Sequence, residues 1–192
     1  MRRPFFLAPV LLMLLFAIVL AACEGPPGAP GGVVALLPDD DTYVLEGETG
    51  DPAAANATET SMVVSSQPLR AVSIMKFELM QFGGIASARL QVRALRQSAA
   101  AVTITVVATD IDWGGESITF ATQPARGPVL GSFVVDTIED GLYDLDVTSY
   151  ALSQFTGVEP EISLAFITSD GAVLISSSDS VDEKPHLLVT PF

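Results

Sequence analysis

The sequence has few of the residues from which many catalytic and metal sites are built. It contains one cysteine, one histidine and one tryptophan among 192 residues. A single cysteine excludes a disulfide within the chain. One cysteine and one histidine cannot supply a zinc site that needs several such ligands. We therefore expect the fold to depend on a hydrophobic core.

Positive charge is also scarce. Nine Lys and Arg residues stand against 23 Asp and Glu residues, which gives a formal net charge of −14, and Lys76 and Lys184 are the only lysines. Proteins bind nucleic acids through clustered Lys and Arg side chains that displace counterions. The composition therefore argues against a nucleic-acid partner and against an anionic lipid surface.

The same shortages argue against catalysis. A Cys–His pair or a Ser–His–Asp triad would have to use His186, which falls in the last predicted strand. Two carboxylates can hydrolyse a glycosidic bond, but no pair stands out among the 23 acidic residues. We expect the protein not to be an enzyme.

The chain begins with a positively charged start and a long apolar run. Arg2 and Arg3 precede an uncharged stretch over residues 5–19, and Leu20-Ala21-Ala22-Cys23 follows it. This order is typical of a secretory signal peptide, and its last part resembles the lipobox of bacterial lipoproteins. The resemblance implies that residues 1–22 are removed and that the Cys23 thiol carries a diacylglycerol. An uncleaved signal-anchor helix and an ordinary cleaved signal are the alternatives.

Each of these alternatives places most of the chain outside the cytoplasm, with the inner or outer membrane left open. Residues 23–38 are rich in Pro and Gly, which predicts a flexible tether. Residues 39–192 are enough for one domain. Loss of Arg2 and Arg3 would move the formal net charge to −16.

Short runs with alternating polarity dominate the domain. Between residues 86 and 94, the even positions hold Ala86, Ala88, Leu90, Val92 and Ala94, and the odd positions are polar. This alternation predicts a strand with one buried face. We expect further strands at 41–46, 61–65, 71–79, 102–106, 131–135, 142–147, 161–168, 172–176 and 186–190. The pattern predicts an all-β antiparallel sandwich, with one short helix at 148–155 that Thr148 caps.

Several short phrases occur in a recognisable order. They are Asp41-Thr42-Tyr43-Val44, Lys76-Phe77-Glu78-Leu79, Ile85-Ala86-Ser87-Ala88-Arg89-Leu90, Trp113 with Ile118-Thr119-Phe120, Asp146-Val147-Thr148 and Ser176-Ser177. This order resembles the DNRLRE-domain family, which is related to jelly-roll carbohydrate-binding modules of bacterial surface proteins and polysaccharide-degrading enzymes. The resemblance covers about residues 40–190 and implies a jelly roll. Glu78 replaces the usual Asp, Phe120 a frequent Trp, and an Asn-Tyr-Gly phrase is missing from the 47–60 loop.

Four side chains are candidates for ligand binding. Trp113 lies in a loop between glycines and acids, where its ring could stack on a sugar. The alternative, which we favour, is that Trp113 plugs one end of the sandwich with its N–H bonded to backbone. Arg89, Gln91 and Arg93 form a polar stripe that suits sugar hydroxyls or carboxylates. The alternative for the stripe is a solvated face that also blocks edge pairing.

Calcium is the candidate metal. Jelly-roll modules often hold one structural Ca²⁺, and this ion takes six to eight oxygen ligands. Asp41, Glu78 and Asp146 are the candidate ligands because they stand in the family phrases. The alternative is that the acidic residues form solvated edges.

Taken together, the anchor and the resemblance predict a cell-envelope lipoprotein that displays a non-catalytic carbohydrate-binding β-sandwich, with a polysaccharide as its partner. The alternative is a structural or assembly lipoprotein that binds an envelope protein through a sheet edge or face.

Overall fold

The computed structural model describes residues 31–47, 56–115, 117–155, 160–181 and 183–192. The predicted signal peptide, Cys23 and the first part of the predicted tether lie outside these ranges. The described strands are β1 (Val34–Leu36), β2 (Asp40–Leu45), β3 (Ser61–Ser65), β4 (Ala71–Glu78), β5 (Ile85–Arg96), β6 (Val102–Thr109), β7 (Arg126–Val135), β8 (Gly141–Asp146), β9 (Glu161–Ile167), β10 (Ala172–Ser176) and β11 (His186–Pro191). The predicted short helix is α3 (Thr148–Gln154). No helix in the described ranges combines the length and apolarity of a membrane span.

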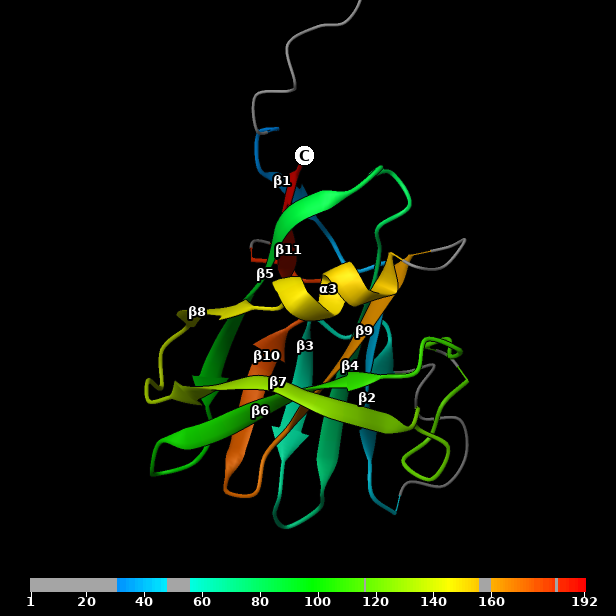
Figure 1. Cartoon of the computed structure of the whole chain (residues 1–192). Coiled ribbons are helices and arrows are strands. Elements are labelled where there is room, and N and C mark those ends of the chain that lie inside the picture. Colours follow the sequence, from blue (N-terminus) through cyan, green and yellow to red (C-terminus); the bar gives the residue numbers. More distant parts are fainter. Residues whose placement is uncertain (1–30, 48–55, 116, 156–159, 182) are drawn as a thin grey trace, which may run out of the picture.

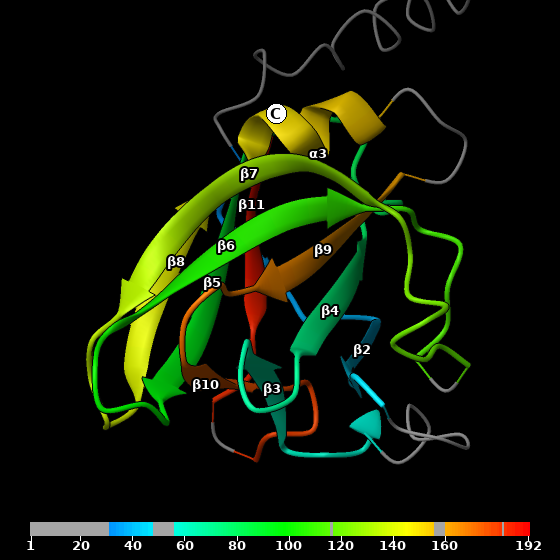
Figure 2. The same ribbon diagram turned by 90° about the horizontal axis from the view of Figure 1, so that it is seen from below.

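The strands form two layers of antiparallel sheet (Figures 1 and 2). One layer, here named the β9 sheet, has the order β2-β4-β9-β6-β7. In the other, named the β5 sheet, β8 pairs with one side of β5, and β11 and β10 pair with its other side. Strands β1 and β3 continue the β5 sheet next to β11 and β10. A single register pair between Ser65 and Ala71 connects the two layers. Because the strands of each layer pair antiparallel and the layers face one another, the predicted antiparallel sandwich is confirmed.

The alternation predicted along β5 is present, with one local exception. Ala88, Leu90, Val92 and Ala94 are buried. Ala86 is exposed instead, because the pairing with β11 shifts at this point and Ile85 takes the inward position. A β-bulge of this kind reverses the direction of side chains beyond it.

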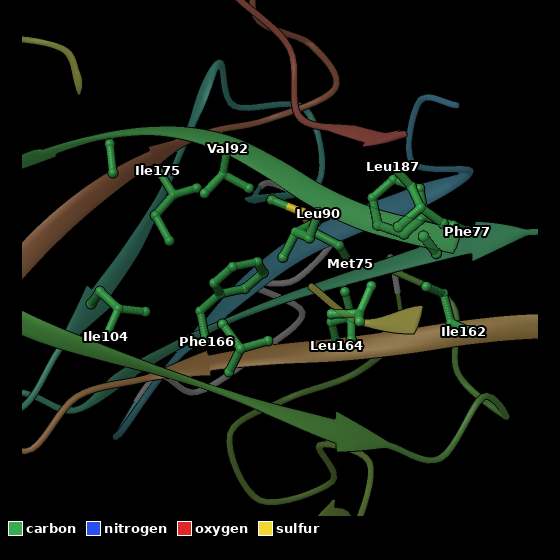
Figure 3. Packing of buried hydrophobic residues seen from close by; sticks show 14 of the residues in the cluster. Met75, Phe77, Leu90, Val92, Ile104, Ile162, Leu164, Phe166, Ile175 and Leu187 are labelled. Carbon is green, nitrogen blue, oxygen red and sulfur yellow. The ribbon is translucent and has the colours of Figure 1, made fainter. Parts of the chain in front are cut away.

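The main core fills the space between the two layers (Figure 3). Phe77 of β4 and Phe166 of β9 are fully buried there, and Leu90 of β5 packs in the same cluster from the opposite layer. Burial of each such side chain contributes about 1.5–3 kcal/mol by removing its apolar surface from water. Because the strands contribute alternate residues to this core, the core fixes their register.

The outer face of the β9 sheet has a second, smaller core. Its members include Ile74, Val107 and Ala165 from neighbouring strands, together with Trp113 and Ile118 from the loop between β6 and β7. This loop therefore covers the sheet as a third layer. Strands β4 and β9 are buried on both faces for this reason, which explains their nearly continuous apolar sequences.

The structure corrects two details of the sequence analysis. Val34–Leu36, which fall within the predicted tether, form β1 and pair with β11, and Leu36 packs against the main core. Thr148 is not the helix cap: Val147 holds that position without a side-chain cap. The Thr148 hydroxyl instead donates to the Ala88 carbonyl at 3.2 Å and accepts from the Ala88 N–H at 3.0 Å, which ties α3 to β5.

Phe166→Ala should lower the free energy of unfolding by about 3–5 kcal/mol, because it leaves a cavity at the centre of the main core. Chemical denaturation measures this change. Val134→Ala, on the exposed side of β7, is the control and should cost less than about 1 kcal/mol. Equal losses in the two variants would contradict the packing described here.

Candidate functional site

Trp113 lies in the second core and not at an open surface. Its side chain is 7% exposed. The indole Nε1–H donates to the Ser163 hydroxyl at 2.8 Å, so its partner is a side chain of β9 where backbone was expected. The Lys76 ammonium lies 5.3 Å from the centre of the ring. Trp113 is thus buried as predicted, but against the outer face of the β9 sheet and not at one end of the sandwich. This position leaves little of the ring face available for stacking on a sugar.

A row of polar residues across the β9 sheet holds the Trp113 loop. Asp40, Lys76 and Ser163 are opposite one another on β2, β4 and β9. Asp40 accepts the Gly115 N–H at 2.8 Å, and Lys76 donates to the Trp113 carbonyl at 2.9 Å. At Gly115 a Cβ atom would collide with the Asp40 carboxylate, so the close approach requires glycine.

The predicted stripe lies on the outer face of the β5 sheet. Arg89 forms an ion pair with Asp144 at 2.9 Å. Arg93 pairs with Asp140 at 3.1 Å and with Glu183 at 2.5 Å. The stripe does not block an edge, because β5 pairs on both sides, with β8 and with β11.

The structure also places Gln91 opposite the single histidine. Gln91 of β5 is half-buried and faces His186 of β11 in the register. Asp144 of β8 is opposite Gln91 on the other side. The stripe therefore belongs to a mixed-charge surface over three strands, where exposed ion pairs contribute little to stability.

The three predicted calcium ligands do not come together. Asp41 bonds to Ser178, Asp146 accepts the Thr148 N–H at 2.9 Å, and Glu78 is exposed at the end of β4. Within the described ranges, no three His, Cys, Asp or Glu side chains are grouped so that they could hold a metal ion. This set of donors does not fit the coordination that Ca²⁺ requires.

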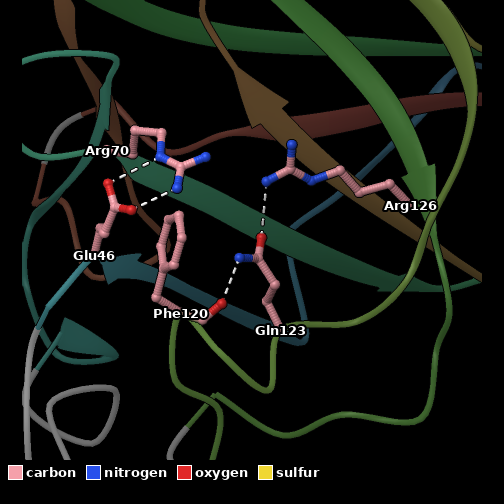
Figure 4. Close-up of polar contacts among 5 residues, drawn as sticks. All are labelled: Glu46, Arg70, Phe120, Gln123 and Arg126. Carbon is pink, nitrogen blue, oxygen red and sulfur yellow. Dashed lines mark hydrogen bonds and ion pairs between the residues drawn. The ribbon is translucent and has the colours of Figure 1, made fainter.

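A cluster around Phe120 brings two arginines together at the margin of the second core (Figure 4). Arg70 binds Glu46 through two hydrogen bonds of 2.9 and 2.5 Å, and its guanidinium carbon lies 5.2 Å from the centre of the Phe120 ring. Arg126 donates to the Gln123 side-chain oxygen at 2.9 Å, and Gln123 donates to the Phe120 carbonyl at 2.6 Å. Burial and the charge of Arg70 lower the pKa of Arg126.

A groove between α3 and β7 was missed by the sequence analysis. It consists of two open cavities of about 300 and 380 Å³ that share Tyr150 as a wall. We name it the α3–β7 groove. Residues that line it include Asp110, Ile111, Arg126, Pro128, Val129, Leu130, Asp146, Ser149, Tyr150 and Gln154. These residues are far apart in the sequence, so no local pattern could have indicated them.

A comparison with known protein families identifies the family of this chain. The model of carbohydrate-binding module family 96 matches residues 33–191. The chain belongs to this family. The match supports the predicted jelly roll of the carbohydrate-binding-module type. Membership of the DNRLRE-domain family stays a prediction. No curated protein matches the chain.

Solved structures similar to this family 96 member include two from carbohydrate-binding module family 22. The CBM22-1 xylan-binding domain from Paenibacillus barcinonensis Xyn10C has a TM-score of 0.39 and 7% identity, over 86% of this chain and 99% of that one. The CBM22-1–GH10 modules of a Clostridium thermocellum endo-1,4-beta-D-xylanase have a TM-score of 0.38 and 10% identity, over 83% of this chain and 29% of that one. This chain thus spans less than a third of the second structure.

Asp41 of β2 is a buried acidic residue that links two parts of the fold. It is 3% exposed and accepts hydrogen bonds from the Ser178 N–H at 2.6 Å and the Ser178 hydroxyl at 3.1 Å. Burial raises the pKa of Asp41 from 3.8 to about 6, against the lowering effect of Ser178. Asp41 therefore connects β2 to the loop before β11.

The raised pKa of Asp41 predicts a pH effect on stability. The folded protein binds this proton more tightly than the unfolded chain, so the contribution of Asp41 is fully present below pH 3.8 and is lost as the pH rises through about 6. The loss amounts to about 3 kcal/mol. Denaturation at several pH values should show this loss in the native protein and not in Asp41→Asn. The control is Asp136→Asn at an exposed position, which should keep the pH profile of the native protein. Parallel pH profiles for native protein and Asp41→Asn would contradict it.

Proposed function

We propose that this protein is a lipid-anchored, non-catalytic carbohydrate-binding protein of the bacterial cell envelope. The observation that carries the proposal is the family 96 match over residues 33–191. The lipobox-like Leu20-Ala21-Ala22-Cys23 supports the anchor. In this proposal the Pro- and Gly-rich segment after Cys23 holds the module away from the membrane, where it captures polysaccharide.

Ion pairs with Arg93 argue against catalysis by Asp140 and Glu183, two carboxylates that lie close enough to act together on a glycosidic bond. Asp140 and Glu183 line an open cavity of about 510 Å³. A hydrogen bond with Asp140 raises the pKa of Glu183. However, Arg93 forms ion pairs with both carboxylates. A glycosidase needs one carboxyl group that donates a proton and another that acts as nucleophile or base, each facing the substrate. A shared guanidinium opposes both roles.

A specific observation also favours the alternative of a structural or assembly lipoprotein. Strand β7 pairs with β6 and ends the β9 sheet, and its Val129 and Val134 side chains are 65% and 52% exposed. A long edge strand with apolar side chains can pair with a strand of another protein. Crosslinking in native membranes that recovers one stoichiometric envelope protein, without dependence on sugar, would favour this function.

Polysaccharide binding tests the main proposal directly. The full protein, extracted in mild detergent, should be retarded in affinity electrophoresis by at least one polymer among xylan, mixed-linkage glucan, galactomannan and polygalacturonate. Heat-unfolded protein is the control. No reducing ends should appear during long incubation. Lack of retardation by every polymer would contradict carbohydrate binding, and released sugar would contradict the non-catalytic assignment.

The anchor has its own test. Cys23→Ser removes the thiol that accepts the lipid, so the acyl mass should be absent and the apolar residues 1–22 should stay attached. Mass spectrometry of the N-terminal peptide measures both effects. Ala22→Ser, which keeps the cysteine and a small residue before it, is the control. An N-terminal peptide of the native protein without acyl mass on Cys23 would overturn lipidation at this residue.

A further inference from the structure

The α3–β7 groove has the volume for more than one sugar ring. Its two cavities, about 300 and 380 Å³, each reach the size typical of ligand sites. Residues of β7 and α3 form the walls, and α3 lies alongside β7 in Figure 2. Both cavities are lined by Tyr150, so they adjoin one another at this residue. This arrangement fits an extended chain better than a compact ligand.

Tyr150 is held in a fixed position. Its hydroxyl donates to the Ser163 carbonyl at 3.2 Å, and the side chain is half-buried. The hydroxyl therefore points toward β9, and the side chain packs against the main core while the residue lines both cavities. An aromatic ring that is already oriented offers an apolar surface to the C–H face of a sugar at little cost in conformational entropy.

Polar side chains occur in both halves of the groove. Asp110, Arg126 and Gln154 line one cavity, and Asp146 and Ser149 line the other. Carboxylate oxygens accept hydrogen bonds, a guanidinium donates them, and amide and hydroxyl groups do both. Sugar hydroxyls also donate and accept, so this mixture of groups matches their chemistry.

The predicted stripe is less suited to the same ligand. Its two guanidinium groups, of Arg89 and Arg93, are already in ion pairs with carboxylates. A sugar bound there would have to compete with those pairs. In the groove, Arg126 has Gln123 as its hydrogen-bond partner and forms no ion pair with an acid of the described ranges.

The charge of the groove indicates the class of sugar. Asp110 and Asp146 carry two negative charges along the groove, against one positive charge on Arg126. The whole chain has a formal net charge of −14. Both the local and the overall field therefore oppose the approach of an acidic polysaccharide.

We infer that the α3–β7 groove is the carbohydrate-binding site of this protein and that it takes an extended, uncharged polysaccharide segment across Tyr150. This inference rests on the proposed function. It adds the location of the site, the aromatic contact and the charge class of the ligand.

Two pairs of variants test the location, with affinity electrophoresis of the full protein in xylan, mixed-linkage glucan and galactomannan. Ser149→Trp fills one cavity from an exposed position on α3 and should weaken retardation at least tenfold. Leu152→Trp, on the same helix but outside the groove, should leave it unchanged. Tyr150→Ala should weaken binding to a similar extent, and Tyr150→Phe should retain most of it. Thermal unfolding shows whether each variant is folded. If Tyr150→Ala does not fold, the result for Ser149→Trp alone tests the location of the site.

The outcomes separate this inference from the function on which it rests. If Gln91→Ala or Arg93→Ala abolishes binding while Ser149→Trp does not, the stripe is the site, the inference is overturned and carbohydrate binding stands. If polygalacturonate binds more than tenfold tighter than every neutral polymer, the charge class is wrong. If the native protein binds no polymer at all, the proposed function fails and this assignment fails with it.

Discussion

The polar row formed by Asp40, Lys76 and Ser163 is the interaction on which the arrangement of the surface loops depends. Each residue comes from a different strand of the β9 sheet, and each forms a hydrogen bond with the Trp113–Gly115 segment. Each such bond contributes about 1 kcal/mol, and at Ser163 and Trp113, which are buried, a polar group left without a partner would cost about 1–3 kcal/mol. The row therefore stabilises one position of the loop and penalises the others.

This constraint extends to the α3–β7 groove. The held loop begins at Asp110 and leads into Arg126, and both residues line the groove. Tyr150 bonds to the backbone of Ser163, whose hydroxyl accepts the Trp113 N–H. One residue of β9 thus positions the loop on one side and the aromatic wall on the other. The groove is preorganised because its walls are attached to the same strand.

The sequence predicted those parts of the fold in which side-chain direction follows from local alternation. The inward residues of β5 are an example, and a bulge explains the exception at Ala86. The short strand β1 escaped prediction because three residues beside a Pro- and Gly-rich segment carry no periodicity, and β11 supplies the partner. The alternation also could not show that a loop would cover the outer face of the β9 sheet. That covering decides between the two interpretations of Trp113.

Spatial assembly explains why the groove was missed and the stripe was found. Arg89, Gln91 and Arg93 alternate on one strand, whereas the groove joins Asp110 and Tyr150 through the tertiary structure. The family phrases hold the scaffold together, because Asp41, Trp113 and Thr148 form hydrogen bonds with distant parts of the fold. Most residues that line the groove lie outside those phrases. A module built in this way can change the sugar that it binds through the groove residues while the hydrogen bonds that hold its scaffold stay the same.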